Sequence, residues 1–257
     1  MGNSTSETRA PIFAVSRLRM GVDGPGITTL VTFMGCPLRC RYCLNKRCHE
    51  PIYEADGRTP RRGIMLLTPK ELYDMVKIDD IYFQTTGGGI CFGGGEPTLY
   101  PEFISEFRAI CGHRWKITLE TSLCCSHATK RSLSEVVDYW IVDIKSIHPN
   151  IYEAYTGESY SPMQLLSSLK MLVPKERVMV RVPRIPGYNT DKEVAADMEC
   201  YTDDCCYYLL AALAGPLKVD NSNLEFIDKE DIDTHQPERY LSYNASRELL
   251  QLFGVHR

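Results

Sequence analysis

The sequence predicts one α/β domain, built as a partial (βα)6 barrel of the TIM type. Short β-branched and apolar runs alternate about six times with amphipathic segments, which is typical of a parallel sheet covered by helices. Glycine-rich and charged segments follow several of the predicted strands. Ligands of such sheets bind at the carboxyl ends of the strands, so these segments are candidate sites.

The predicted elements follow one another in regular order. Apolar, β-branched runs predict strands at residues 27–34, 89–92, 116–120, 139–144, 177–182 and 224–227. A capping box at Thr68, with proline at the first helical position, opens a helix that reaches about Lys77. Further helices are predicted at residues 101–111, about 130–137, 161–172, in stretches between 192 and 214, and at 245–253.

No linker, repeat or low-complexity segment divides the chain, so residues 1–257 are expected to form a single domain. Residues 1–16 are expected to be an N-terminal extension. Residues 47–66 contain several prolines and glycines and predict a long loop. Residues 190–257 form a C-terminal part that carries no recognisable motif.

The composition argues against several classes of partner. A net charge of −4 gives no basic field for nucleic acid. No apolar run approaches the length of a bilayer span, and the first residues lack the apolar core of a signal peptide. We therefore expect a cytoplasmic protein whose 11 cysteines are reduced thiols or metal ligands, and no membrane or nucleic-acid partner.

Three cysteines in the spacing C-x3-C-x2-C form the most informative motif: Cys36, Cys40 and Cys43. Three thiolates this close can hold an iron–sulfur cubane and leave one iron open to a small molecule. A zinc site is the alternative, and it would need a fourth ligand such as Cys48 or His49. Cys200, Cys205 and Cys206 lack the regular spacing of a second site.

A second motif follows the strand predicted at 89–92 and reads Gly93-Gly94-Gly95-Glu96-Pro97. Glycines let a ligand approach the backbone closely, and a glutamate can accept hydrogen bonds from an ammonium group. A glycine cluster alone is an ordinary turn. Its position some fifty residues after the cysteine motif makes the pair far more specific than either motif alone.

The cysteine motif, with Leu44 and Asn45 after it, and the glycine turn resemble the signature of radical S-adenosylmethionine (SAM) enzymes. The resemblance implies a 4Fe–4S cluster on the three cysteines, with SAM chelated to the open iron. One electron would cleave SAM and give a 5′-deoxyadenosyl radical that abstracts hydrogen from the substrate. It also implies that Gly93, Gly94, Gly95 and Glu96 hold the methionine amino group of SAM. Tyr42 matches the position that packs by the adenine, and it is equally consistent with a core residue.

The segment Asp23-Gly24-Pro25-Gly26, just before the first predicted strand, resembles the glycyl radical enzyme-activating enzymes. In that family the segment lies near a peptide loop of the partner. The resemblance implies hydrogen abstraction from a glycine of a glycyl radical enzyme. It further implies flavodoxin or ferredoxin as electron donor and an anaerobic setting.

Other residues extend the resemblance along the chain. Asp143 and Lys145 are similar to a D-L-K segment whose lysine meets the SAM carboxylate, although a surface ion pair is the plainer explanation. Glu120 and Thr121, together with Asp143, are similar to a monovalent-cation site. Arg181 is implied to lie near the cofactor or the radical, and residues 185–188 resemble the turn that follows that arginine in the family.

The resemblance is strong over residues 17–188 and weak beyond them. Glu120 stands where the family usually has aspartate, and residues 224–228 lack the family's histidine. The first departure concerns the cation site, and the second concerns the substrate side. They leave open a radical enzyme that modifies a peptide or small molecule, and a non-catalytic zinc or cluster protein that binds a partner.

Overall fold

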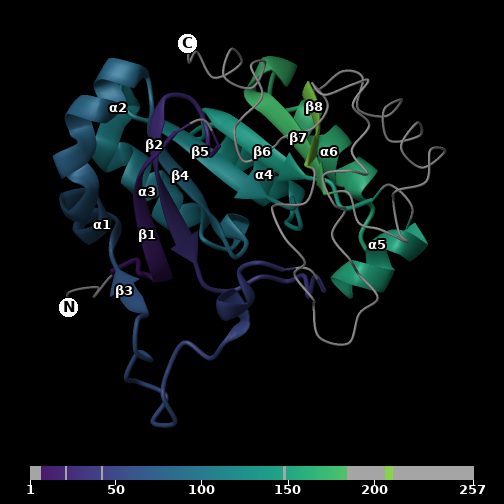
Figure 1. The fold of residues 1–257 in the computed structure, drawn as a ribbon, viewed down its shortest axis with the longest axis horizontal. Helices are drawn as coiled ribbons and strands as arrows, with labels where there is room; N and C mark the ends of the chain where they lie inside the picture. The colour runs from purple at the N-terminus through teal and green to yellow at the C-terminus, as the bar shows by residue number, and fades with distance from the viewer. Residues whose placement is uncertain (1–6, 21, 42, 147–148, 184–205, 211–257) are drawn as a thin grey trace, which may run out of the picture.

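The computed structural model describes residues 7–20, 22–41, 43–146, 149–183 and 206–210. Within them one sheet has the strand order β3-β1-β2-β4-β5-β6-β7-β8 (Figure 1). Its strands are β1 (Ala10–Met20), β2 (Ile27–Phe33), β3 (Met65–Leu67), β4 (Gly89–Gly94), β5 (Lys116–Thr121), β6 (Tyr139–Asp143), β7 (Val178–Pro183) and β8 (Cys206–Leu210). From β2 to β8 all neighbours pair in parallel, whereas β1 and β3 are antiparallel at one edge. The predicted partial (βα)6 barrel is confirmed.

Helices connect the parallel strands and cover one face of the sheet (Figure 1). They are α1 (Pro69–Val76), α2 (Asp80–Thr86), α3 (Pro101–Cys111), α4 (His127–Ser134), α5 (Pro149–Thr156) and α6 (Pro162–Lys170). All except α5 contribute buried residues to the main core. Alternate strand residues such as Val31, Phe92 and Leu119 pack into that core, so the residues between them lie on the opposite face.

That opposite face of the sheet is polar. It carries Thr28, Thr118, Glu120, Asp143 and Arg181, all buried or half-buried. Polar side chains on the inner face of a partial barrel cost desolvation energy unless they pair or meet a ligand. The residues that the fold holds in this position are therefore the first place to look for a site.

Several predicted elements match the structure and others need correction. The capping box of α1 and the bounds of α3 are confirmed. Residues 10–16 are not an extension, because they belong to β1 and pair with β2. The helical prediction within 192–214 is wrong at Cys206–Leu210, which is β8. The elements predicted at 224–227 and 245–253, like most of 190–257, lie outside the described residues.

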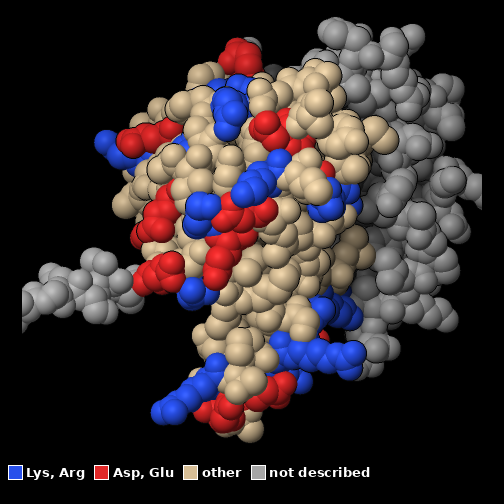
Figure 2. Space-filling model, turned by 90° about the vertical axis from the view of Figure 1, so that its left-hand side faces the viewer, with Lys and Arg blue, Asp and Glu red and all other residues tan. Residues whose placement is uncertain are grey.

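The outer surface carries charges of both signs. Figure 2 shows basic and acidic side chains interspersed over one face rather than gathered by sign. Several of them pair, as Lys77 does with Asp74 at 2.7 Å. No helix among the described residues is long and apolar enough to cross a membrane.

Candidate functional site

The cysteine loop leaves the carboxyl end of β2 and is fixed to the fold at both ends. The Gly35 N–H donates to the Cys48 carbonyl at 2.7 Å, and the Arg39 N–H donates to the Thr156 carbonyl at 2.7 Å. Thr156 ends α5, which lies on the same side of the sheet as this loop (Figure 1). These hydrogen bonds hold the loop in a fixed position beside the rest of the site.

The structure holds Cys36, Cys40 and Cys43 on one loop as half-buried side chains. Cys36 and Cys40 pack against a small cluster formed by Leu38, Cys124 and Tyr152. The charges of Cys40 and Cys43 both act on the Cys36 thiol. Burial, followed by the charge of Glu96, raises the pKa of Cys36 to about 12.

A second set of ligand atoms converges on Cys43. The sulfurs of Cys43 and Cys48 and a ring nitrogen of His49 all lie within 4.8 Å of one another. Cys48 and His49 belong to the 3-10 turn η1 (Lys46–His49), which follows the cysteine loop. The two residues weighed as zinc ligands in the sequence therefore do lie beside the triplet. The hydrogen bond from Cys48 is the largest of the effects that lower the pKa of Cys43 to about 6.

The glycine turn is joined directly to the start of the cysteine loop. The Gly95 N–H donates to the Phe33 carbonyl at 2.9 Å, and the Glu96 N–H donates to the Gly35 carbonyl at 2.8 Å. A Cβ atom on residue 95 would collide with the Gly35 carbonyl oxygen, so only glycine fits there. The two sequence motifs are therefore one structural unit.

Glu96 is buried and its carboxylate is fully engaged by the protein. Its two oxygens accept five hydrogen bonds, from the backbone and hydroxyl groups of Thr98 and Ser122 and from the hydroxyl of Thr121 at 2.5 Å. Glu96 thereby ties the end of β4 to the end of β5. Thr121 lies beside this carboxylate, and the structure does not place it with Asp143 as the resemblance implied.

A row of paired charges crosses the polar face of β5, β6 and β7. Arg181 donates to Asp143 at 2.7 Å and to Glu120 at 2.8 Å, and Lys145 donates to Asp143 at 2.9 Å. Lys145 is 8% exposed, so its pair with Asp143 is internal and the surface explanation is wrong. Burial alone would raise the pKa of Asp143, but Arg181 and Lys145 hold it below its ordinary value.

Glu120 has a different balance. Burial, together with the carboxylates of Asp23 and Asp143, raises the pKa of Glu120 to about 7, although Arg181 opposes this rise. Burial is the largest of these effects, so the pKa moves upward although Arg181 donates to this carboxylate at 2.8 Å. Glu120 is thus the member of the row that changes charge near neutral pH.

The segment Asp23–Gly26 lies at the amino end of β2, opposite to the end that carries the cysteine loop. Asp23 is buried and paired with Arg19 of β1. Gly24 has φ +126° and packs so closely on Thr118 that a side chain would collide with its hydroxyl. The segment therefore closes the polar face from that end. The contact of Asp23–Gly26 with a partner stays a prediction.

Some predicted residues lie outside the described part of the chain, and some contributors were not predicted. The predicted residues outside the described part are Tyr42, residues 185–188, Cys200 and Cys205. The residues that contribute to the site but were not predicted are Arg19, Thr98, Ser122, Tyr152 and Thr156. The Ser122 hydroxyl directly follows predicted Thr121, which is a usable signal. Arg19 and Thr156 meet the site only through tertiary contacts, which no local pattern reveals.

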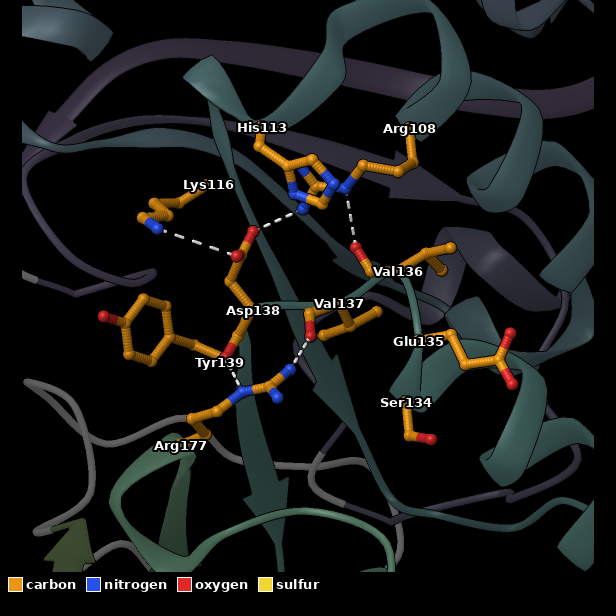
Figure 3. Close-up of a pocket in the computed structure, with 10 residues that line it drawn as sticks. All are labelled: Arg108, His113, Lys116, Ser134, Glu135, Val136, Val137, Asp138, Tyr139 and Arg177. Atoms are coloured by element: carbon orange, nitrogen blue, oxygen red, sulfur yellow. Dashed lines mark hydrogen bonds and ion pairs between the residues drawn. The ribbon is translucent and has the colours of Figure 1, made fainter.

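A cavity of about 330 Å³ lies at the amino ends of β5 and β6 (Figure 3). Arg108, Lys116 and Arg177 surround Asp138 there. Arg108 pairs with Asp138 and donates to the Val136 carbonyl at 2.8 Å, while Arg177 donates to the Asp138 carbonyl at 2.7 Å. Protein groups already bind these three side chains. We therefore assign the cavity a structural role and do not take it as the candidate site.

Comparisons with known proteins agree with this geometry. The chain matches the family model described as "Radical SAM superfamily" over residues 30–198. It is 26% identical to the choline trimethylamine-lyase activating enzyme of Oleidesulfovibrio alaskensis over 238 residues, which cover 73% of this chain and 76% of that protein. It is 30% identical to the pyruvate formate-lyase-activating enzyme of Staphylococcus aureus over 182 residues, 67% of each chain.

Solved structures agree on the fold. Streptococcus suis SuiB superposes with a TM-score of 0.55 at 13% identity, covering 90% of this chain and 52% of SuiB. A radical SAM methyltransferase from Sphaerobacter thermophilus gives 0.53 at 17% identity, covering 90% of this chain and 64% of that chain. These likenesses extend to the arrangement of the strands and helices.

Proposed function

The chain belongs to the radical SAM superfamily, and on that premise we propose that it is an activating enzyme that abstracts hydrogen from a glycine of a glycyl radical enzyme. The observation that carries the proposal is the joining of the cysteine loop to the glycine turn through Gly35, Gly95 and Glu96. That contact sets the two cofactor-binding motifs side by side.

The residues present fit a 4Fe–4S cluster. Cys36, Cys40 and Cys43 are half-buried cysteines of one loop, and they would supply the soft thiolate ligands that such clusters require. When bound, the cluster and SAM supply a reducing electron and a 5′-deoxyadenosyl radical. Cys36, whose pKa is raised in the cluster-free chain, must lose its proton when it ligates iron.

The other site residues would bind and orient SAM. Because the Glu96 carboxylate is engaged by five protein donors, we assign the SAM amino group to backbone carbonyls of Gly93–Gly95, whose course Glu96 fixes. Lys145, held by Asp143, would meet the SAM carboxylate. Arg181 would hold the side chains of Glu120 and Asp143 in place through its hydrogen bonds to both. A monovalent cation at Asp143 would share the two carboxylate oxygens with Arg181 and Lys145.

The choice of a protein substrate rests on the Asp23–Gly26 segment and on relatives named as lyase-activating enzymes. We propose that the partner's glycine loop enters the polar face, and that Asp23 and its neighbours position that loop. Flavodoxin or ferredoxin would supply the electron. Burial of the polar face fits this use, because water around a radical invites quenching.

The test is anaerobic reconstitution with iron and sulfide, followed by dithionite reduction in the presence of SAM. The wild-type protein should take up a 4Fe–4S cluster, release 5′-deoxyadenosine and, with its glycyl radical enzyme, give that partner's radical signal in electron paramagnetic resonance. A Cys36/Cys40/Cys43→Ser variant should bind no stoichiometric iron and sulfide, whereas Cys111→Ser, remote on α3, should bind as wild type.

Two results would contradict the proposal. One is stoichiometric iron and sulfide in the triple variant. The other is a reduced wild-type cluster that releases no 5′-deoxyadenosine. If cleavage occurs but only a peptide or small molecule is modified, the radical chemistry stands and the glycyl radical partner is wrong.

A further inference from the structure

Three metal-binding side chains meet at the end of the cysteine loop. The sulfurs of Cys43 and Cys48 and a ring nitrogen of His49 all lie within 4.8 Å of one another. Two sulfurs that share one tetrahedral zinc ion are about 3.8 Å apart, because each Zn–S bond is about 2.3 Å long. Side-chain movements of about 1 Å therefore suffice to bring all three atoms onto a single ion.

The backbone around the two cysteines is fixed by hydrogen bonds. The Gly35 N–H donates to the Cys48 carbonyl at 2.7 Å, and the Cys48 N–H donates to the Asn45 carbonyl at 2.9 Å. The Cys43 N–H donates to the Cys40 carbonyl at 3.1 Å. The Cys48 residue is also buried, with 2% of its surface exposed. Ligands held in this way lose little conformational freedom when they bind a metal.

This set of ligands differs in geometry from the cysteine triplet. Each thiolate of a cubane binds a separate iron, so Cys36, Cys40 and Cys43 need not converge on one point. Within the described part of the chain, no other three ligand atoms of Cys, His, Asp or Glu approach one another as closely as those of Cys43, Cys48 and His49. Two thiolates and one imidazole are typical donors to a single zinc ion.

Arg39 contacts the same histidine. Its guanidinium lies against Nδ1 of His49, and a guanidinium can only donate hydrogen bonds. Once either ring nitrogen binds a metal, Nδ1 is metal-bound or protonated and no longer accepts from Arg39. Arg39 must then turn away, and it can do so because its side chain is exposed.

We propose that Cys43, Cys48 and His49 form a binding site for a single zinc-type divalent ion, and that occupancy of this site excludes assembly of the cluster. Binding releases the protons of the two thiols to solvent and leaves the fourth tetrahedral position to water. The site itself does not depend on the proposed function. The exclusion rests on it, because Cys43 would have to leave the zinc ion to ligate iron.

The first experiment titrates the reduced, metal-free protein with Co²⁺, whose absorption reports tetrahedral thiolate ligation, and with Zn²⁺ against a chromophoric chelator. The wild type should bind one ion per chain. Cys48→Ala and His49→Ala should each weaken zinc binding by at least about 10–100-fold, which is the cost of losing even a partner outside the ligand shell. Cys111→Ala should bind zinc as wild type does. It is the matched control, because Cys111 is also 2% exposed but ends α3.

The second experiment adds one equivalent of zinc before reconstitution with iron and sulfide. Zinc should block cluster uptake by the wild type. It should not affect Cys48→Ala, which keeps all three cysteines of the triplet. Cys36→Ser should show the reverse pattern, because it loses a cluster ligand and keeps the three proposed zinc ligands. His49 is only half-buried, so His49→Ala carries the test if Cys48→Ala does not fold.

Three results would overturn the proposal. Equal zinc affinity in the wild type and in both Cys48→Ala and His49→Ala refutes the site. Loss of zinc binding in Cys36→Ser shows that the triplet holds the ion instead. Full cluster uptake by a wild type that retains its zinc refutes the exclusion. A wild type that takes up no cluster even without zinc refutes the proposed function and leaves the zinc site standing.

Discussion

Glu120 is a residue whose charge should respond to changes of pH near neutrality. Its folded-state pKa of about 7 lies above the ordinary 4.5 because it is buried beside Asp23 and Asp143. Between these values the folded chain holds a proton that the unfolded chain has lost. Linkage then requires that the contribution of Glu120 to stability falls as pH rises through this window.

Glu120→Gln should remove that loss. We expect the free energy of unfolding of the variant, relative to wild type, to increase by up to about 3 kcal/mol between pH 5 and pH 7.5. Urea unfolding of the cluster-free proteins at both pH values measures it. Glu176→Gln, which changes an exposed carboxyl, should keep the wild-type slope. A Glu120→Gln slope equal to that of wild type would show that Arg181 keeps Glu120 ionised.

At the residue scale, the sequence indicated which segments lie together better than it indicated the hydrogen-bond partners of each side chain. The cysteines, the glycine turn, Asp143 and Lys145 do meet at one end of the sheet, because motifs that follow parallel strands are brought together by the strands. The partners of Glu96 were not predictable. They depend on how far β4 extends relative to β5, and a shift of one residue would turn Thr121 to the other face.

At the level of elements, β1 contains a bulge that directs Arg19 toward Asp23. Ser16 pairs with Leu30 and Arg19 with Thr28, so two residues of β1 face one of β2. The bulge is formed with Leu18 at φ 56°, in the left-handed region that costs an L-residue about 1–2 kcal/mol. Leu18 is 44% exposed and recovers little of this by packing.

Leu18→Gly should therefore raise the free energy of unfolding, by about 0.5 kcal/mol once the flexibility of glycine is subtracted. Leu123 has a similar φ of 60° but is 0% exposed, so Leu123→Gly should cost about 3 kcal/mol through lost packing. Equilibrium urea unfolding of both variants makes the comparison. A comparable loss in the two would show that Leu18 is held by contacts and not merely strained.

Local signals explain which elements were predicted. The helices α1 and α3 begin with proline and carry a clear apolar stripe, and their ends depend on nearby residues only. The strand β1 carries Arg17 and Arg19 and loses its apolar alternation at the bulge, so its sequence does not resemble a strand. The run Cys206–Leu210 is uniformly apolar and aromatic, and such a run does not distinguish a buried strand from a helix.

For the whole molecule, the cavity around Asp138 and the candidate site lie at opposite ends of the same parallel sheet. Asp138 binds Arg108, Lys116 and the Ile117 N–H at the amino ends of β5 and β6 (Figure 3). The cysteine loop and the glycine turn lie at the carboxyl ends of β2 and β4. Stability and chemistry should therefore be separable by mutation.

Asp138→Ala leaves the buried Arg108 without its carboxylate and should lower the free energy of unfolding by about 3 kcal/mol. The same variant, kept well below its melting temperature, should bind iron and sulfide as wild type does. Thermal unfolding and iron analysis measure the two effects. A parallel loss of both would mean that the ends of the sheet are coupled.

The anchoring of the cysteine loop has a consequence for biosynthesis. Its neighbours come late in translation: Gly95 and Glu96 follow by about fifty residues, and Thr156, which fixes Arg39, by more than a hundred. At typical ribosomal speeds the thiols emerge roughly 10 s before the last of these anchors. During that interval the cysteines of the nascent chain lack the contacts that hold their loop in place. We therefore expect iron and sulfide to be bound only after the chain has been made past Thr156.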